Sequence, residues 1–408
     1  MKMVGFCQWG CHAPRIQIFV SDLSATGVVR NAVAIANEAA ASGYEVRLLT
    51  CSPDGVMRSQ LRADVTLVRL ARDARAERSR RRQLQQVLVE YRRHSRNWQP
   101  DIMLSAGNHG HLLSCIAWLG LPGAKLLRVS NDLSHGSPSL LTRCWRNLKF
   151  RLVAGLADRL VLVSRALGEH PLLAGQLRSG RAHIIANGVD VEAVRAASRH
   201  PCPHRWAGDR AVPVVLAVGR HARQKNFGTL LRAFASARAR RPMRLIILGD
   251  GQRTETARLQ VLATSLGISA DVDFVSAVAN PFPFMAAART LVLPSLWEGS
   301  SNVLLEAMAC GTAIIASRTA GDANLTLDGG KYGILVDPHD VESLASSLLQ
   351  QTGKGSILPG KRASAFERSL AMRQYIRLFD QLIDGVAATH LDRVHARFIG
   401  SPSHNPRM

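Results

Sequence analysis

LVLPSLWEGSSNVLLEAMACGTAIIAS, residues 291–317, is the stretch that decides the fold. It begins with three apolar residues, which predict a short buried strand, and continues into a polar loop that contains glycine. Residues 302–310, rich in Leu, Ala and Met, predict a helix, and Gly311 stands where a left-handed residue commonly ends one. Residues 313–316 predict the next buried strand. The stretch therefore predicts a strand, a loop, a helix and a second strand in succession.

Two glutamates mark this unit, Glu298 in the loop and Glu306 on the helix, eight positions apart. At about 1.5 Å per helical residue they lie roughly 12 Å apart, the reach from a sugar ring across a diphosphate to a ribose. A helix N-terminus between them is an anion site. The alternative is that both are solvated charges, the usual state of a glutamate. The helical neighbours of Glu306 offer no charge partner, which favours a ligand; they are Asn302, Val303, Ala309 and Cys310.

The segment EGSSNVLLEAMACG, residues 298–311, resembles the E-x7-E signature of glycosyltransferase family 4, retaining enzymes of GT-B fold. The resemblance covers most of the chain. It implies an α/β GT-B fold, with two Rossmann-like domains facing a central cleft and a C-terminal helix crossing back to the first. It implies that Glu306 binds the ribose hydroxyls, and that Glu298 helps to hold the donor sugar and also stabilises positive charge in the transition state. The backbone implied to hold the donor sugar and its phosphate is that of Gly299, Ser300, Ser301 and Asn302.

The composition is that of a globular protein with two domains, because 408 residues with 47% hydrophobic side chains can fill two cores. No apolar run approaches the roughly 18 residues of a membrane span, and we expect no secretion signal. The seven cysteines are scattered and odd in number, which favours reduced cytosolic thiols. Cys7, Cys11 and His12 could form a metal site, but no second ligand cluster accompanies them, so we expect no metal and no other cofactor.

The net charge is +22 and is unevenly distributed along the chain. Residues 1–185 carry 26 Lys and Arg against 12 Asp and Glu, whereas residues 186–408 carry 26 against 18. A strongly basic half predicts an anionic partner, such as a membrane surface, a nucleic acid or a phosphorylated substrate.

The first strand–helix–strand unit lies near the N-terminus. Residues 16–20 and 45–50 predict strands, and residues 28–42 predict the helix between them. Gly27 stands in the preceding loop, where the backbone can approach a phosphate of the donor. The family usually has two adjacent glycines here, and this chain keeps only Gly27, which leaves a plain tight turn as the alternative.

A candidate histidine follows the strand predicted at 101–105. Polar residues at the carboxyl end of a strand are where doubly wound sheets bind ligands, and this strand runs into AGNHGH, residues 106–111. By resemblance, His109 matches the histidine that many family members place beside the donor sugar, and His111 is a close second. The alternative is that both are ordinary loop histidines.

The chain between the two halves resembles the family's P-N-G-V-D connector at residues 187–190. Alternating strands and helices on both sides imply two Rossmann-like domains. We expect a helix at 364–383 and no fixed structure in the basic tail. The predicted divisions are 1–190 for the acceptor-side domain, 191–361 for the nucleotide-sugar domain, 362–390 for the returning helix and 391–408 for the tail.

The second half opens with a buried strand at 214–218, followed by Gly219, Arg220 and Lys225. These residues resemble the family's G-R-x4-K diphosphate clamp. Arg220 can bind two phosphate oxygens and Lys225 adds a compact charge, so the pair can replace a divalent metal. The alternative to phosphate binding is that Arg220 and Lys225 are each a solvated cation in a loop. The loop at 276–280 lies where the family reads the base, and its candidate residues are Val278 and Asn280.

Two basic segments predict contact with a lipid surface. Residues 69–96 hold ten Arg, and residues 143–151 mix Arg and Lys with Trp145, Leu148 and Phe150. Such a mixture suits a helix that lies on anionic lipid. The alternative is a solvated helix in a chain that is rich in Arg throughout.

These observations predict a cytoplasmic, metal-independent, retaining glycosyltransferase, peripheral on the inner face of the plasma membrane. Its expected donor is UDP-hexose, UDP-N-acetylhexosamine or GDP-mannose, and its expected acceptor is a lipid-linked surface glycan. An epimerase or phosphorylase of the same fold is an alternative, since fold does not settle function. A basic nucleic-acid-binding protein is another, but the chain has no aromatic stacking motif, so we expect no nucleic acid partner.

Overall fold

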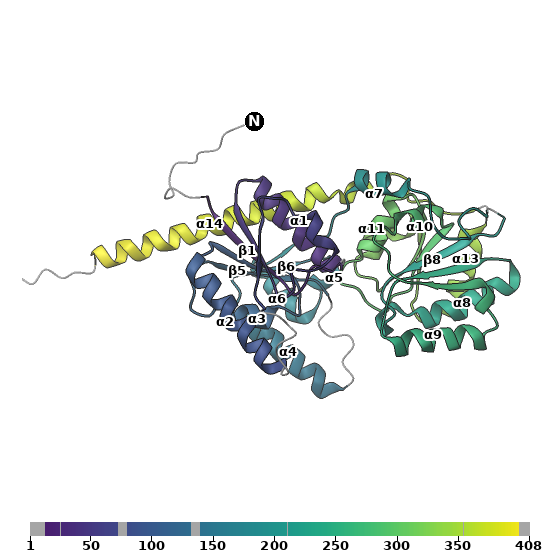
Figure 1. Cartoon of the computed structure of the whole chain (residues 1–408), viewed down its shortest axis with the longest axis horizontal. Helices are drawn as coiled ribbons and strands as arrows, with labels where there is room; N and C mark the ends of the chain where they lie inside the picture. The colour runs from purple at the N-terminus through teal and green to yellow at the C-terminus, as the bar shows by residue number, and fades with distance from the viewer. Residues whose placement is uncertain are drawn as a thin grey trace, which may run out of the picture. The chain divides into compact units, whose positions relative to one another are not determined.

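The computed structural model describes six stretches of the chain, residues 13–24, 26–71, 80–131, 139–209, 211–353 and 355–399. The Cys7, Cys11 and His12 pattern and part of the basic segment at 69–96 lie outside these residues. The described chain contains two parallel sheets with helices between the strands (Figure 1).

The first sheet has seven strands, and β1 lies inside it between β2 and β4. Its order is β3 (Thr66–Arg69), β2 (Glu45–Thr50), β1 (Arg15–Val20), β4 (Ile102–Ser105), β5 (Ala124–Val129), β6 (Arg159–Leu162) and β7 (Ala182–Ile184). Ile16 pairs with Val46 on one side and Ile102 on the other, and all three are buried. Strands buried on both faces read as continuous apolar runs, which is why the sequence predicts them.

Helices connect the strands of the first sheet. They are α1 (Gly27–Ala41), α2 (Arg80–Trp98), α3 (His111–Ala117), α4 (Leu140–Gly155), α5 (Arg165–Gly168) and α6 (Pro171–Arg178). α1 begins one residue earlier than predicted, so Gly27 is its first residue and Thr26 its N-cap.

The second sheet has six strands around β8. Its order is β10 (Val272–Val275), β9 (Arg244–Leu248), β8 (Val214–Val218), β11 (Thr290–Leu293), β12 (Ala313–Ser317) and β13 (Ile334–Val336). Its helices are α8 (Phe227–Arg240), α9 (Arg253–Ser265), α10 (Phe282–Ala287), α11 (Asn302–Ala309), α12 (Ala323–Thr326) and α13 (Val341–Thr352). Neighbouring residues of β8 belong to opposite cores, Val215 to one and Leu216 to the other, so helices cover both faces.

The chain divides into two compact units, and the end of the chain belongs to the first. One unit comprises residues 1–128, 152–160 and 372–408, and the other comprises 129–151 and 161–371. In the sequence, α7 (Val191–Ser198) follows the last strand of the first sheet and precedes the first strand of the second, and Asp190 caps it through the backbone N–H of Ala193. The helix therefore begins directly after the predicted connector at 187–190.

α14 (Arg368–Ile399) is the predicted C-terminal helix, and it is longer than the sequence suggested. It continues past 383 into the tail that we expected to lack fixed structure, because residues 386–399 contain no Pro and only helix-compatible residues. Within the first unit the Phe379 ring lies edge-on to Tyr44, with centroids 6.2 Å apart. Tyr375 accepts a hydrogen bond from the buried Arg128, Nε to Oη 3.1 Å. These contacts attach α14 to β2 and β5, as the predicted fold requires.

Two features of the described residues concern membrane spans and metal binding. None of the helices there is both long and apolar enough to cross a membrane. Likewise, the described part of the chain holds no cluster of three or more His, Cys, Asp or Glu that could ligate a metal.

Candidate active site

The topological switch point of the second sheet lies between β8 and β11. β8 connects onward to β9 on one side of the sheet, while β11 follows on the other, so their carboxyl ends open into one crevice. The loop after β8 carries Gly219, Arg220 and Lys225, and the loop after β11 carries Glu298. The order of the strands therefore brings together predicted site residues that lie far apart in the sequence.

Two glycines allow the backbone at the end of β8 to pack closely. Gly249, which follows β9, has φ 146°, and a Cβ there would lie 2.2 Å from the carbonyl oxygen of Gly219. Gly219 has φ 155°, and a Cβ there would lie 2.9 Å from Cε of Lys225. No larger residue fits at either place without moving its neighbours. The stem of Lys225 consequently lies against the backbone of Gly219.

Lys225 and Glu298 form an ion pair across the switch point. Nζ of Lys225 donates to Oε1 of Glu298 at 2.6 Å, and the side chains are only 15% and 10% exposed. The same carboxylate accepts from Ser295 Oγ at 2.8 Å and from Gln224 Nε2 at 3.4 Å. The ion pair thus joins Lys225, which was predicted to bind the donor diphosphate, directly to Glu298, which was predicted to be catalytic. Gln224 and Ser295 are the two partners that sequence reasoning missed.

Asn226 fixes the loop that carries Lys225. Its φ of 55° places it in the left-handed region, where Asn is among the few favoured non-glycine residues. Its side-chain amide donates to the carbonyl oxygens of Pro294 at 3.1 Å and Pro338 at 2.7 Å. The loop after β8 is therefore tied to the loop after β11 by a second contact besides the ion pair.

Arg220 has a different environment from Lys225. Its side chain is exposed, and it makes no hydrogen bond or ion pair with any residue that the structure describes. A guanidinium of this kind keeps its five donors for an anion in solution. The two predicted clamp cations therefore differ, one being held by a carboxylate and the other open to solvent.

Helix α11 begins at Asn302, four residues after Glu298, so only part of the interval between the glutamates is helical. The predicted separation of roughly 12 Å assumed helical rise throughout and does not apply to the loop residues. Glu306 is 8% exposed, and the nearby Cys310 has its thiol pKa raised to about 12, mainly by burial and further by Glu306. Glu306 therefore lies on a buried face of the helix.

Ser301 is the N-cap residue of α11, but its side chain makes no capping bond. Its hydroxyl oxygen is buried and has no hydrogen-bond partner among the described residues. The other predicted backbone contacts, Gly299 and Ser300, precede it in the loop, and Asn302 accepts a hydrogen bond from Asn187 Nδ2 at 2.9 Å. The N-terminal turn of α11 is thus left with donors for a ligand.

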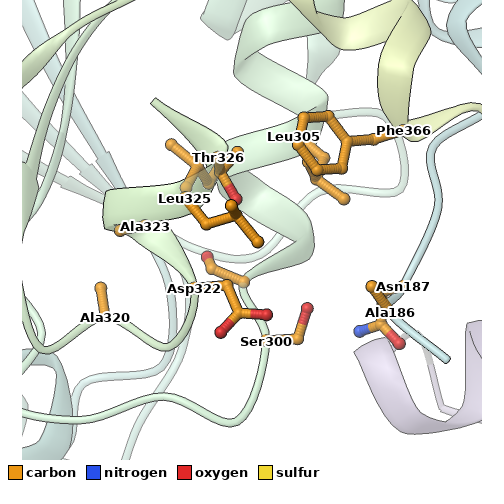
Figure 2. Close-up of a pocket in the computed structure, with 12 residues that line it drawn as sticks. Ala186, Asn187, Ser300, Leu305, Ala320, Asp322, Ala323, Leu325, Thr326 and Phe366 are labelled. Carbon is orange, nitrogen blue, oxygen red and sulfur yellow. The ribbon is translucent and has the colours of Figure 1, made fainter. Parts of the chain in front are cut away.

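A small cavity of about 30 Å³ lies beside this turn. Figure 2 shows its polar lining residues Asn187, Ser300 and Asp322 together with the apolar Leu305 and Phe366. That volume holds about one water molecule and is too small for a sugar ring. A sugar ring therefore does not fit inside this cavity, which Ser300 and Ser301 line.

The two predicted base-side residues are both partly buried. Val278 packs against the core of the second sheet. Asn280 donates from Nδ2 to the carbonyl oxygen of Ala197 at 3.0 Å and accepts from the N–H of Phe282 at 3.2 Å. The Asn280 side chain is thus engaged within the fold, which leaves the loop backbone as the group available to a base.

Both candidate histidines follow β4 in the first unit. His109 is exposed, whereas His111 is buried and shares a hydrogen bond between Nδ1 and Ser105 Oγ at 2.9 Å. Burial lowers the pKa of His111 to about 3, so this imidazole is neutral at physiological pH. His109 is thus the candidate that a substrate can reach. Gly27 and His109 belong to the first unit, and the ion pair belongs to the second.

Family models match both halves of the chain. Residues 25–193 match the model described as Glycosyltransferase Family 4, and residues 212–352 match the one described as Glycosyl transferases group 1. The second match contains β8, the clamp residues and both glutamates.

Three curated relatives illustrate the similarity. The lipopolysaccharide core biosynthesis glycosyltransferase LpsE of Rhizobium meliloti is 37% identical over 36% of this chain and 41% of its own. The D-inositol 3-phosphate glycosyltransferase of Rhodococcus erythropolis is 32% identical over 64% of this chain and 62% of its own. A Campylobacter jejuni diphospho-undecaprenol 4-alpha-N-acetylgalactosaminyltransferase is 31% identical over 33% and 36%. The chain spans less than two thirds of the length of each relative.

Solved structures share the fold. Sucrose-phosphate synthase from Thermosynechococcus elongatus has a TM-score of 0.72 and 21% identity, over 91% of this chain and 100% of its own. Anabaena HepE in complex with UDP-glucose has a TM-score of 0.72 and 17% identity, over 90% and 99%. These likenesses confirm the predicted GT-B fold with two Rossmann-like, parallel-sheet domains. Since each half also matches its own family model, the chain belongs to glycosyltransferase family 4.

Proposed function

We propose that the chain is a retaining glycosyltransferase that moves a hexose or N-acetylhexosamine from a nucleotide sugar to a surface-glycan acceptor. The observation that carries the proposal is the ion pair of Lys225 and Glu298 at the switch point, beside the exposed Arg220. The pair holds an ammonium in place before a donor arrives. Arg220 and Lys225 would then neutralise the leaving diphosphate, and Glu298 would face the positive charge that develops on the sugar.

The remaining site residues have roles in the same proposal. Glu306 would accept hydrogen bonds from the ribose hydroxyls, and the N-terminal turn of α11 would bind a phosphate oxygen. The backbone near Val278 and Asn280 would contact the base. From the first unit, His109 would lie beside the donor sugar and Gly27 would allow approach to the diphosphate.

The acceptor in this proposal is a lipid-linked glycan at the cytoplasmic face of the plasma membrane. The Campylobacter jejuni relative is named for a diphospho-undecaprenol substrate, and the Rhizobium meliloti relative for lipopolysaccharide core biosynthesis. The net charge of +22 suits a peripheral protein on anionic lipid.

The proposal is tested by incubating the protein with UDP-glucose, UDP-N-acetylglucosamine and GDP-mannose, with and without a lipid-linked glycan fraction. We expect one donor to release its nucleoside diphosphate in the presence of acceptor, with the sugar recovered on lipid. Conversion of the sugar nucleotide without transfer would favour an epimerase instead. No binding or turnover of any donor would contradict the proposal.

Arg220→Ala is expected to lower catalytic efficiency, because it removes the solvent-facing half of the cation pair. One charge-assisted hydrogen bond contributes about 1.5–3 kcal/mol, so the loss should be roughly 10- to 150-fold. We propose that the cations act without a metal, so EDTA should leave the parent enzyme active. Loss of activity in EDTA and its return with Mg²⁺ or Mn²⁺ would show that a metal carries the charge. Arg253→Ala, an exposed cation elsewhere in the second unit, is the matched control.

Glu306→Ala is expected to weaken donor binding more than it lowers turnover, because its proposed ligand is the ribose and not the reacting centre. The loss of a charged acceptor should cost about 1.5–3 kcal/mol of donor affinity. Calorimetric titration with the nucleoside diphosphate alone isolates this contact from the sugar. Unchanged affinity in a folded variant would remove Glu306 from the site.

A further inference from the structure

The helix α4 presents an apolar face to solvent. Leu141, Trp145 and Leu152 are 83%, 68% and 64% exposed, and Leu148 between them is also exposed. Their spacing of i, i+4, i+7 and i+11 places all four on one side of the helix. The opposite side holds Phe150, which is buried. In a solvated amphipathic helix the outward side would be polar, whereas the outward side of α4 is apolar.

The exposed apolar residues are concentrated around this helix. Nine of the fifteen large hydrophobic side chains that are exposed in the described chain lie within residues 112–156. Three belong to α3 and the turn after it, and they follow the same spacing: Leu112, Ile116 and Leu119. α3 packs beside the end of α4, where Cys115 Sγ donates to the carbonyl oxygen of Val153 at 3.7 Å. A helix face with four large exposed apolar residues in three turns, as on α4, marks an interaction surface, whereas single exposed residues do not.

The charges beside this face identify its partner. Lys149 and Arg151 are exposed, and at about 100° per residue they lie on opposite sides of the apolar stripe. Residues 140–155 contain no Asp or Glu. A second copy of the chain, related by a two-fold axis, would bring these cations against their own equivalents. An anionic lipid surface instead accepts the apolar side chains below its headgroups and the cations among them.

We propose that α4 docks the protein on an anionic bilayer, with Leu141, Trp145, Leu148 and Leu152 inserted at the boundary of headgroups and acyl chains. Lys149 and Arg151 then contact the lipid phosphates on either side. The inference rests on the peripheral location proposed above and names the surface responsible. It also corrects the sequence interpretation, in which Phe150 faced the lipid and the segment 69–96 shared the role. In the described part of α2, Val87 and Tyr91 are buried, so that helix offers no equivalent stripe.

The test compares binding to vesicles of phosphatidylcholine alone and of phosphatidylcholine mixed with phosphatidylglycerol. The full chain should sediment with the mixed vesicles only. Combined replacement Leu141→Gln, Trp145→Gln and Leu148→Gln should weaken this binding at least tenfold. Because these side chains are exposed, the variant should fold normally. The matched control, Val261→Gln with Leu358→Gln, changes two equally exposed residues of the second sheet's helices and loops and should bind as the parent does.

Two further measurements separate the possible occupants. Lipids brominated along the acyl chain should quench part of the parent's tryptophan emission, and Trp145→Phe should remove that quenching. Lys149→Gln with Arg151→Gln should bind more weakly and with less dependence on salt than the parent, unlike Arg240→Gln with Arg253→Gln. Equal vesicle binding by parent and stripe variant would overturn the inference. The inference would also be overturned if the parent protein did not bind vesicles but dimerised through the apolar stripe of α4. None of these assays contains nucleotide, so their failure is distinct from failure of glycosyl transfer.

Discussion

Glu298→Gln is expected to lower the turnover number by about 10²–10³-fold while changing donor affinity little. The substitution keeps the shape of the side chain and removes its charge. If Glu298 stabilises the positive charge that develops on the donor sugar, removing its charge raises the free energy of the transition state and hardly changes that of the bound ground state. Single-turnover transfer measures the chemical step, and calorimetric titration measures the donor affinity separately.

The control for this substitution is Glu342→Gln, which removes the same charge from an exposed position in the first turn of α13. It should leave both quantities unchanged. A Glu298→Gln enzyme with parental turnover would exclude Glu298 from the reacting centre. An equal loss of affinity and of transition-state stabilisation would assign it to donor binding alone.

Lys225→Met is expected to reduce the stability of the second unit by about 3 kcal/mol, the lower end of the range for a buried ion pair that loses one partner. The carboxylate of Glu298 would remain nearly buried without its cation, and only its hydrogen bonds from Ser295 and Gln224 would remain. Hydrogen exchange at the amides of β8 and β11 in increasing urea measures this loss without interference from the first unit.

The double variant Lys225→Met with Glu298→Gln tests whether the two side chains interact. Removing both charges leaves no buried charge without a partner. The double variant should recover most of the stability that Lys225→Met loses. The surface pair of Arg238 and Asp271, joined at 2.7 Å but with Arg238 44% exposed, is the matched control. Its Arg238→Met variant should lose less than about 1 kcal/mol. Additive losses for Lys225 and Glu298 would mean that the two side chains do not interact in solution.

Much of the fold follows from the sequence because parallel strands are short, apolar and bounded by turn residues. Strands at 45–50 and 214–218 have the predicted limits. Gly311 adopts φ 77°, as predicted for the residue after a helix. No helix was predicted at α7, which directly follows the connector at 187–190, although Asp190 is a favoured N-cap residue.

The site was less predictable because its central contact is not local. Lys225 and Glu298 are separated by 73 positions, and only the strand order places them together. Which face of α4 is exposed was equally hard to predict from the sequence, because a periodic apolar pattern ordinarily indicates a face that packs on the core. Here Phe150 and Val153 pack inward, while the more regular stripe of Leu and Trp faces solvent.

The contacts of α14 with Tyr44 and Arg128 have a consequence for synthesis on the ribosome. The first compact unit includes the part of α14 that follows residue 371, so the polypeptide segment that completes this unit emerges after the whole of the second unit. Although domains are generally expected to fold in order from the N-terminus, residues 161–371 leave the exit tunnel as a continuous stretch before the earlier unit is complete. Until then the buried guanidinium of Arg128 lacks Tyr375. The second unit can therefore fold on the nascent chain before α14 is available to complete the first.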